Sequence, residues 1–515
     1  MKTFKNPILP GFYPDPSICR VKEDYYLVTS SFAYFPGVPI FHSKDLVNWE
    51  QIGHVLDRVS QLPLDGQEQS AGIFAPTIRY NNGIFYTITT NVGHGGNFFV
   101  TATDPAGPWS EPNYLGAEGI DPSLFFDDDG KVYYTGTRPA PEGQKYDGNW
   151  EIWLQELDLE TNKLVGDTYG LWRGALHDVI WPEGPHIYKI KGQYYLMISE
   201  GGTGPHHAVS IARSSDVKGN YMGNPGNPIL THRHLGRAYP IVNVGHCDLV
   251  ETQNGEWWVV ALASRIYGGY YRNLGRETYL APVTWEDGWP VISVGSGKLE
   301  MSYPAPNLQE SKNLKSEVFE NFEGDTLDFK WNFLRTPKEE FYSLSERPGF
   351  LTLKLRPERI TELTNPSFIG RRQQHINFSA TTLMEFTPNS ENEVAGIVLI
   401  QSNNFNFSFT YTKKGQDEIV RITKCVDGKE EILKEKVVLA SRLLLKVEAK
   451  GQNYSFYFSK DGKEYKALIE NEDGRILSTD VAGGFVGAEM GLYASSNGVR
   501  SENKAYFEWF EYIGV

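Results

Sequence analysis

The chain has 515 residues, 40% of them hydrophobic and 13% aromatic, which is enough for two or three domains and unlike a disordered protein. Its net charge of −15 gives no electrostatic footprint for nucleic acid or an anionic membrane. No apolar run approaches the roughly 20 residues of a membrane span. The cysteines lie too far apart for a CxxC metal site or a disulfide framework: Cys19, Cys247 and Cys425. The first residues lack the apolar core of a signal peptide, so we expect a cytoplasmic protein, or a secreted one if a leader was trimmed.

The first 300 residues repeat one two-strand unit five times. Each copy has a short strand with a polar start, a turn, and a second strand rich in aromatic residues. The copies begin at Asp15-Pro16-Ser17, Ala75-Pro76-Thr77, Asp121-Pro122-Ser123, Glu183-Gly184-Pro185 and Gly245-His246-Cys247. Periods of roughly 45 to 63 residues with several strands each are typical of propeller blades. We therefore predict a five-bladed β-propeller over residues 1–300, because a plain sandwich would not explain the recurrence.

The pattern changes near residue 300. The stretch Ser302-Tyr303-Pro304-Ala305-Pro306 is typical of a linker. Alternating strands then return, for example over residues 351–355 and 443–447, with hairpin turns such as Asp461-Gly462 between them. We predict a β-sandwich of the jelly-roll, concanavalin-like type over residues 317–515. The fold class is therefore all-β, with no long helix.

The residue that leads the innermost strand of a propeller blade lies at the mouth of the central channel. Three acids lead repeats, Asp15, Asp121 and Glu183, and we predict that they gather at one funnel together with His246. Glycoside hydrolysis requires two carboxyls, because one accepts a proton from water and the other protonates the leaving oxygen. A third carboxylate keeps the acid protonated by like charge. A single Asp-Pro-Ser is more often a turn, but its recurrence, with Glu183 in the equivalent place, favours a catalytic site.

A series of longer motifs runs through the chain in order. They are Asn6-Pro7-Ile8-Leu9-Pro10-Gly11-Phe12-Tyr13-Pro14-Asp15-Pro16-Ser17, Phe35-Pro36-Gly37-Val38, His42-Ser43-Lys44-Asp45-Leu46-Val47-Asn48-Trp49, Phe74-Ala75-Pro76, Asp121-Pro122-Ser123, Pro182-Glu183-Gly184-Pro185, Gly275-Arg276-Glu277-Thr278 and Phe322-Glu323-Gly324-Asp325. Together they resemble family 43 glycoside hydrolases, especially the β-xylosidase branch with a C-terminal sandwich. The resemblance covers nearly the whole chain.

The resemblance implies a role for each acid. Asp15 matches the general base that activates water, Glu183 the general acid, and Asp121 the residue that orients the acid and tunes its pKa. The family inverts anomeric configuration, which predicts carboxyls roughly 6.5–9.5 Å apart with room for water. The expected activity is exo-acting release of a terminal pentose, β-1,4-D-xylose or α-L-arabinofuranose, from xylo-oligosaccharides or arabinoxylan fragments.

The resemblance also implies residues that hold the terminal sugar. Arg276 matches an arginine that hydrogen-bonds substrate hydroxyls, and its alternative role is a salt bridge, with Glu277 as a candidate partner. Phe32 and Phe74 match apolar walls around the sugar. The branch often has Trp where Phe74 stands, and this departure leaves both xylose and arabinofuranose open.

Two further segments are candidates to reach the funnel. The loop Gly201-Gly202-Thr203-Gly204-Pro205-His206-His207 offers Thr203 for substrate binding, while its two histidines face either the funnel or solvent. In the sandwich, Ala482-Gly483-Gly484-Phe485 matches a loop with which this branch places an aromatic residue at the rim. Phe485 would then block one end of the site and make the enzyme exo-acting. The alternative is that the sandwich only stabilises the protein or binds sugar as an accessory.

The predicted chemistry needs no organic cofactor. His246 matches a channel histidine that neighbours a bound water or a structural calcium in some family members. Calcium prefers oxygen ligands, so a structural hydrogen-bonding role is the stronger interpretation of His246. The expected partner is a small oligosaccharide, with no nucleic acid and no membrane, and the resemblance makes a homo-oligomer a reasonable expectation.

Other functions fit the sequence less well. Retaining fructoside hydrolases are also five-bladed propellers with three acids, but they resemble Asn-Asp-Pro-Asn and Glu-Cys-Pro where this chain has Pro14-Asp15-Pro16-Ser17 and Pro182-Glu183-Gly184-Pro185. An inactive sugar-binding propeller would not need all three acids. A scaffold for protein partners would have no reason to line its channel with carboxylates. A hydrolase of another glycoside stays open as an alternative.

Overall fold

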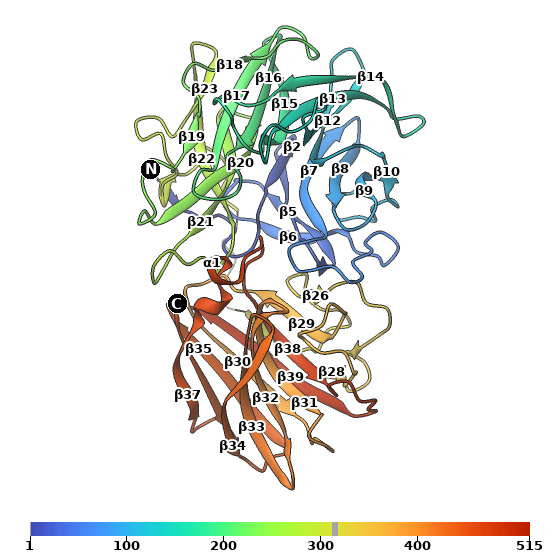
Figure 1. Cartoon of the computed structure of the whole chain (residues 1–515), viewed down its shortest axis with the longest axis vertical. Coiled ribbons are helices and arrows are strands. Elements are labelled where there is room, and N and C mark those ends of the chain that lie inside the picture. The colour runs from blue at the N-terminus through green and yellow to red at the C-terminus, as the bar shows by residue number, and fades with distance from the viewer. Residues whose placement is uncertain (1, 312–317) are drawn as a thin grey trace.

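The computed structural model describes residues 2–311 and 318–515, which form two domains stacked along the long axis of the molecule (Figure 1). Strands dominate both domains. The described residues contain two short helical turns, η1 (Gly474–Leu477) and α1 (Thr479–Ala482), and α1 lies where the domains meet. The predicted all-β class, with a five-bladed propeller followed by a sandwich, is confirmed. None of the described helices has the length and apolar character needed to cross a membrane.

Each propeller blade is an antiparallel sheet whose strands follow one another in chain order. Blade 1 consists of β2 (Ser17–Val21), β3 (Asp24–Val28), β5 (Gly37–Ser43) and β6 (Glu50–Leu56). Blade 2 consists of β7 (Ile73–Asn81), β8 (Ile84–Asn91), β9 (Gly96–Ala102) and β10 (Asn113–Tyr114). Blade 3 consists of β11 (Ile120–Phe126), β12 (Val132–Pro139), β13 (Trp150–Asp158) and β14 (Lys163–Trp172). Blade 4 consists of β15 (Glu183–Ile190), β16 (Gln193–Glu200), β17 (Ala208–Ser214) and β18 (Met222–Gly223), and β19 (Leu230–Thr231) also pairs with β17. Blade 5 consists of β20 (Ile241–Glu251), β21 (Trp257–Arg265), β22 (Glu277–Glu286) and β23 (Trp289–Ile292). The first strands contact one another in a ring, from β2 through β7, β11, β15 and β20 back to β2. These five strands therefore line the central channel.

Local sequence explains the blade geometry. In blade 2, Asn82 and Gly83 have φ of 49° and 86° and join β7 to β8. Asn-Gly favours this left-handed turn, whose twist matches that of the flanking strands. In blade 5, β21 is buried from Trp258 to Ser264, because neighbouring blades cover both faces of its sheet.

The chain closes the ring by pairing its first residues with blade 5. Strand β1 (Thr3–Lys5) pairs with β24 (Ser302–Pro304), which follows the last blade. The Asn6 side chain donates to the Leu280 carbonyl at 2.9 Å and accepts from the Leu280 N–H at 3.0 Å. Hydrogen bonds between distant parts of the chain thus fix the segment that leads to Asp15.

The second domain packs two antiparallel sheets face to face. The larger sheet contains β27 (Tyr342–Ser343), β28 (Leu351–Lys354), β39 (Lys504–Gly514), β30 (Asn377–Glu385), β35 (Arg442–Lys450), β36 (Asn453–Ser459) and β37 (Lys466–Asp473), with β25 (Val318–Glu320) added to β39. The smaller contains β29 (Ser367–Arg372), β38 (Glu489–Ser495), β31 (Val394–Ser402), β32 (Phe405–Lys414), β33 (Asp417–Val426) and β34 (Lys429–Val437). Phe407 and Phe409 of the smaller sheet pack on Phe456 of the larger, with ring centroids 5.7 and 5.6 Å apart. The predicted first residue of this domain, 317, lies outside the described residues.

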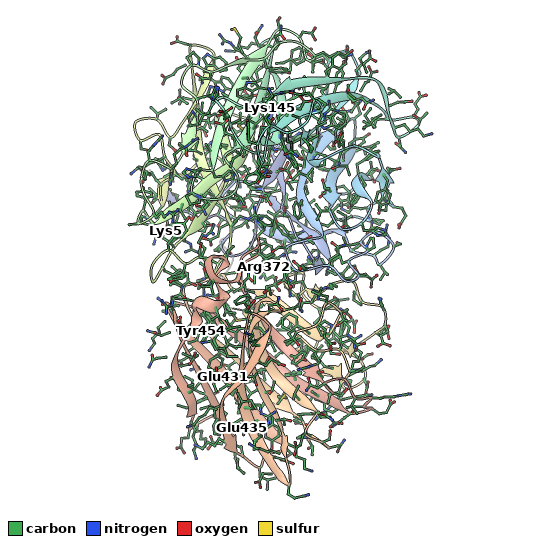
Figure 2. All side chains as sticks on the ribbon, in the orientation of Figure 1. Lys5, Lys145, Arg372, Glu431, Glu435 and Tyr454 are labelled. Carbon is green, nitrogen blue, oxygen red and sulfur yellow. The ribbon has the colours of Figure 1, made fainter. Side chains whose placement is uncertain are left out.

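Backbone pairing and buried arginines join the sandwich to the propeller. Strand β4 (Tyr34–Phe35) of the propeller pairs with β26 (Phe333–Leu334) of the sandwich. Arg372 lies at the junction, and its Nε donates to the Phe12 carbonyl at 2.6 Å (Figure 2). Because Phe12 is three residues before Asp15, the sandwich is attached at the end of the propeller where the predicted funnel opens.

Candidate active site

Side chains at or near the start of three inner strands, together with His246 within β20, line one pocket. Asp15, Asp121 and His246 have φ of 54°, 53° and 45°, a region that non-glycine residues rarely occupy and that often marks functional sites. The pairing register of the inner strands shifts beside Asp121, Glu183 and His246, and such bulges re-aim side chains. The resulting pocket has a volume of about 660 Å³ and is lined by all four of these residues.

Asp15 lies among donors that favour its ionised form. Its Oδ1 accepts from Nη1 of Arg276 at 2.9 Å, and its Oδ2 accepts from the Ser30 hydroxyl at 2.7 Å. Nδ1 of His246 lies 3.9 Å from Oδ1. Burial alone would raise the pKa of Asp15, but these neighbours outweigh burial and hold that pKa below its ordinary value. Asp15 is therefore a carboxylate at neutral pH.

Glu183 has the opposite environment. Burial raises its pKa well above the ordinary value, and the negative charges of Asp121 and Asp15 add to that effect. Burial also raises the pKa of Asp121, to about 6, even though His246 and the N–H of Gly184 favour its ionised form. That N–H donates to Oδ2 of Asp121 at 3.1 Å. The pocket therefore pairs an ionised carboxylate with a protonated one, the arrangement that acid–base chemistry requires.

Arg276 makes its ion pair with Asp15. Glu277, the partner considered from the sequence, pairs instead with Arg265 at 2.7 Å and accepts from the Gly11 N–H at 2.8 Å. Nη1 of Arg276 also lies 3.4 Å from the Thr203 hydroxyl. Arg276 thus keeps donors beside the carboxylate of Asp15, where sugar hydroxyls could bind.

Three phenylalanines form one wall of the pocket. Phe32 and Phe74 have ring centroids 5.1 Å apart, and Phe485 lies 6.1 and 6.0 Å from them. Phe485 comes from the sandwich, in the loop after α1, and its N–H donates to the Ser70 hydroxyl at 2.8 Å. Gly484 permits this approach, since a Cβ at its position would lie 2.2 Å from that hydroxyl. The wall closes the pocket on the side of blades 1 and 2.

The loop over residues 201–207 borders the pocket from blade 4. Thr203 and both histidines line the pocket. His207 is buried, with Nδ1 3.0 Å from the Asn243 carbonyl, whereas His206 is exposed at the rim. The sequence left open whether these histidines face the funnel or solvent. In the structure both border the pocket, but only His206 is exposed to solvent.

Two tryptophans of the lining escaped the sequence analysis. Trp150 begins β13, and Trp181 precedes the Pro182-Glu183 motif with a φ of 46°. The Trp181 N–H donates to the Gly148 carbonyl at 2.8 Å, which ties the two segments together. The one available signal was the aromatic residue directly before the motif that carries Glu183.

The surroundings of His246 do not fit a calcium site built from side chains. Within residues 2–311 and 318–515, no group of three or more His, Cys, Asp or Glu side chains is arranged to hold a metal. The ring of His186 lies 6.4 Å away. Of the nearby carboxylates, Asp15 is already paired with Arg276, and Asp121 accepts from the Gly184 N–H. Calcium needs several oxygen ligands, so its presence stays a prediction without support from these residues.

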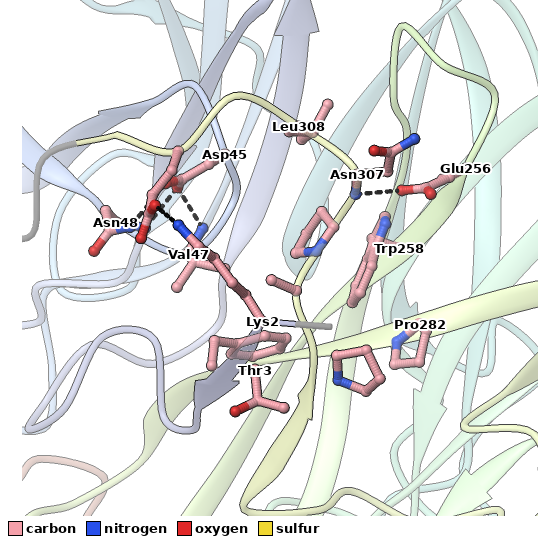
Figure 3. Close-up of a pocket in the computed structure, with 15 residues that line it drawn as sticks. Lys2, Thr3, Asp45, Val47, Asn48, Glu256, Trp258, Pro282, Asn307 and Leu308 are labelled. Atoms are coloured by element: carbon pink, nitrogen blue, oxygen red, sulfur yellow. Dashed lines mark hydrogen bonds and ion pairs between the residues drawn. The ribbon is translucent and has the colours of Figure 1, made fainter.

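A larger hollow of about 770 Å³ lies at the other end of the propeller, between blades 1 and 5 (Figure 3). Its carboxylates are engaged in structural bonds. Asp45 accepts from the N–H groups of Val47 and Asn48 at 2.9 and 2.7 Å, and Glu256 accepts from the Asn307 N–H at 3.0 Å. The pocket that contains Asp15 and Glu183 is therefore the better candidate for the active site.

Comparison with known proteins shows which family the chain belongs to. Residues 4–290 match the family model "Glycosyl hydrolases family 43", and residues 320–513 match "Beta xylosidase C-terminal Concanavalin A-like domain". The chain belongs to glycoside hydrolase family 43. This confirms the family resemblance found in the motifs.

Relatives of this family 43 member extend over its full length. A "Xylosidase/arabinosidase" of Butyrivibrio fibrisolvens is 52% identical over 98% of each chain. A "Non-reducing end alpha-L-arabinofuranosidase" of Bacteroides ovatus is 40% identical over 99% of this chain and 95% of the relative. The solved structure of a xylan beta-1,4-xylosidase from Bacillus halodurans has a TM-score of 0.93 at 36% identity and covers 99% of both chains.

Proposed function

We propose that this family 43 enzyme removes single pentose residues, β-1,4-D-xylose or α-L-arabinofuranose, from the non-reducing ends of xylo-oligosaccharides or arabinoxylan fragments. The observation that carries the proposal is the pairing of an ionised Asp15 with a protonated Glu183 in one pocket closed by an aromatic wall. The names of the relatives, a xylosidase/arabinosidase and an arabinofuranosidase, support the sugar class.

The reaction follows from the charge states. A water molecule attacks the anomeric carbon and gives a proton to Asp15, while the bond from that carbon to the leaving oxygen breaks. Glu183 gives its proton to the leaving oxygen, so the fragment departs as a neutral alcohol. Attack from the face opposite the leaving group inverts the anomeric configuration. The side chains and water supply every group that this reaction uses.

Asp121 and Arg276 act on the two reacting carboxyls. The negative charge of Asp121 keeps Glu183 protonated until the bond breaks, and its bond to the Gly184 N–H orients it beside Glu183. Arg276 keeps Asp15 ionised and presents donors to the sugar hydroxyls. Phe485 supports exo action, because its ring closes the pocket beyond the terminal sugar.

The direct test uses aryl β-D-xylopyranoside and aryl α-L-arabinofuranoside, with proton NMR to identify the first-formed sugar. We expect the inverted anomer, and the ratio of the two rates ranks the sugars. Release of the retained anomer would overturn the mechanism. Near-wild-type rates for Asp15→Asn would overturn the assignment of the base.

Two properties stay predictions of the resemblance and the sequence. Association of copies into a homo-oligomer would be checked by light scattering of the purified protein. A cytoplasmic location would be checked by fractionating the source cells.

A further inference from the structure

A second, smaller hollow lies beside the active-site pocket. It has a volume of about 130 Å³ and shares His206 with that pocket. Its walls come from the segment before β20, with Arg233 and Arg237, and from the segment between β21 and β22, with Tyr270. The hollow is therefore built between blades 4 and 5, directly behind the 201–207 loop.

The hollow carries positive charge without a matching carboxylate. Nε of Arg233 donates to the Thr231 hydroxyl at 3.3 Å, but its Nη2 is buried and has no hydrogen-bond partner. Arg237 is exposed, with its guanidinium carbon 5.6 Å from the Tyr270 ring centroid. In the described part of the chain, no ion pair includes Arg233 or Arg237. Arg272, whose guanidinium carbon lies 5.5 Å from the Tyr270 ring centroid, instead pairs with Asp480 at 2.8 Å.

This arrangement is unusual for the chain. The protein has a net charge of −15, so free arginines that converge on one hollow do not reflect its composition. A buried N–H without a partner carries a desolvation penalty. A guanidinium matches a carboxylate in shape and charge and can bind it through two parallel hydrogen bonds. A carboxylate is therefore the kind of anion that these two side chains could bind.

The position of the hollow connects it to the leaving fragment. Glu183, which protonates the leaving oxygen in the proposed reaction, begins β15, and the 201–207 loop joins β16 to β17 of the same blade. The wall formed with Phe485 closes the side of blades 1 and 2. The fragment therefore leaves past Trp181 and the exposed His206, which borders both hollows.

We propose that Arg233 and Arg237 form a subsite for the carboxylate of an acidic sugar, a uronic acid branch carried by the leaving fragment. The inference rests on the proposed function, because it assigns a place to the part of the substrate beyond the cleaved bond. A neutral oligosaccharide lacks the carboxylate and gains nothing from these arginines. The subsite thus distinguishes acidic from neutral fragments that share the same terminal pentose.

The test compares two substrates with the same terminal xylose, linear xylotriose and a xylo-oligosaccharide with a uronic acid on its second sugar. We expect Arg233→Gln and Arg237→Gln each to lower kcat/KM on the acidic substrate about tenfold, as expected for losing a hydrogen bond between charged groups. Hydrolysis of xylotriose should stay within about twofold of wild type. The matched control is Arg500→Gln, an exposed arginine of the sandwich paired with Glu502, which should change neither substrate.

Several results would overturn the subsite. An equal loss of kcat/KM on both substrates would show that the arginines have a structural role. An unchanged kcat/KM on the acidic substrate would show that the arginines do not contact its carboxylate. An effect of free D-glucuronate on xylotriose hydrolysis that disappears in Arg233→Gln would show a site for free effectors instead of a branch subsite.

Binding measurements separate this inference from the proposed function. Calorimetry with Glu183→Gln should show tighter binding of the acidic oligosaccharide than of xylotriose, and adding Arg237→Gln should remove the difference. If wild type cleaves neither substrate but the binding difference is found, the proposed function fails and the subsite stands. Equal affinity for the two oligosaccharides overturns the subsite whatever the activity.

Discussion

Nη1 of Arg276 lies 2.9 Å from Oδ1 of Asp15, while Nε of the same guanidinium donates to the Phe485 carbonyl at 3.2 Å. One side chain therefore links the carboxylate that activates water in the proposed reaction to the loop by which the sandwich reaches the pocket. The guanidinium carbon also lies 5.4 Å from the Phe32 ring centroid and 5.6 Å from that of Phe485. The second domain thus helps to set the charge state of the first domain's active site.

Replacing this arginine should change the pH dependence of catalysis. Arg276 lowers the pKa of Asp15, and Asp15 acts as a base only when it is ionised. In Arg276→Gln the pKa of Asp15 rises, so the acidic limb of the kcat/KM profile moves to higher pH. We expect a loss of about 10- to 100-fold at neutral pH, from a charge-assisted hydrogen bond. An unchanged acidic limb in a folded variant would contradict the role of Arg276.

Asp121 should control the alkaline limb instead. Glu183 acts only when protonated, and the charge of Asp121 contributes to its raised pKa. Asp121→Asn removes that charge but leaves an oxygen that can accept from the Gly184 N–H. The pKa of Glu183 then falls, and activity is lost at lower pH on the alkaline side. An alkaline limb of the kcat/KM profile that stays in place or moves to higher pH would contradict this role.

The acid and the base should differ in how they depend on the leaving group. A good leaving group, such as dinitrophenol, needs little protonation, so Glu183→Gln should lose much less activity on its glycoside than on xylobiose. Asp15→Asn should lose about 10²–10⁴-fold on both, because water must be activated in either case. The measurement is kcat on the two substrates, with the melting temperature as a control for folding. Equal losses for Glu183→Gln would contradict its role as the acid.

Phe485 should act mainly on binding. Its ring contacts those of Phe32 and Phe74, and aromatic contacts of this kind contribute about 0.5–1.5 kcal/mol each beyond their buried area. Phe485→Ala should therefore raise KM for xylobiose and the inhibition constant of xylose by about tenfold, with a smaller effect on kcat. Phe485→Leu, which keeps an apolar wall, serves as the control, and its KM and inhibition constant should lie between those of wild type and Phe485→Ala. A fall in kcat with unchanged KM would contradict this assignment.

The sequence predicted those features that depend on repetition. Because every blade begins with an equivalent inner strand, the recurrence of Asp15, Asp121 and Glu183 at strand starts was enough to bring them to one pocket. The repeats did not reveal an ion pair between inner strands in the central channel. Arg79 and Asp248 look like exposed charges in their strands, yet they form a largely buried pair at 2.8 Å across 169 residues of sequence, because the inner strands converge.

Features set by single loops were harder to predict. Ser70 and Trp181 lie in irregular segments whose course depends on contacts with other blades or with the sandwich. No periodicity marks such residues, since a loop follows no repeating geometry. Phe485 was expected only through the family resemblance, because 470 residues separate it from Asp15 and its approach requires two domains to dock.

A buried carboxyl in the sandwich should make folding stability depend on pH. Both oxygens of Glu489 are buried without hydrogen-bond partners. Arg372 lies opposite it in the neighbouring strand but gives its Nε to the Phe12 carbonyl. Burial raises the pKa of Glu489 to about 7, against the opposing effects of Arg372, the neighbouring Asn332 side chain and Arg371.

The sign of the effect follows from proton binding. Between pH 4.5 and about 7 the folded protein keeps a proton on Glu489 that the unfolded chain releases, so this group's contribution to stability falls as pH rises through that window. The expected change is about 3 kcal/mol. The Gln side chain of Glu489→Gln does not titrate, so the variant escapes this loss of stability. Its melting temperature should therefore exceed that of wild type by a margin that grows from pH 5 to pH 7. Glu431→Gln, at an exposed carboxyl, is the control and should track wild type. A constant difference between Glu489→Gln and wild type across this range would show that Glu489 is ionised in the folded protein.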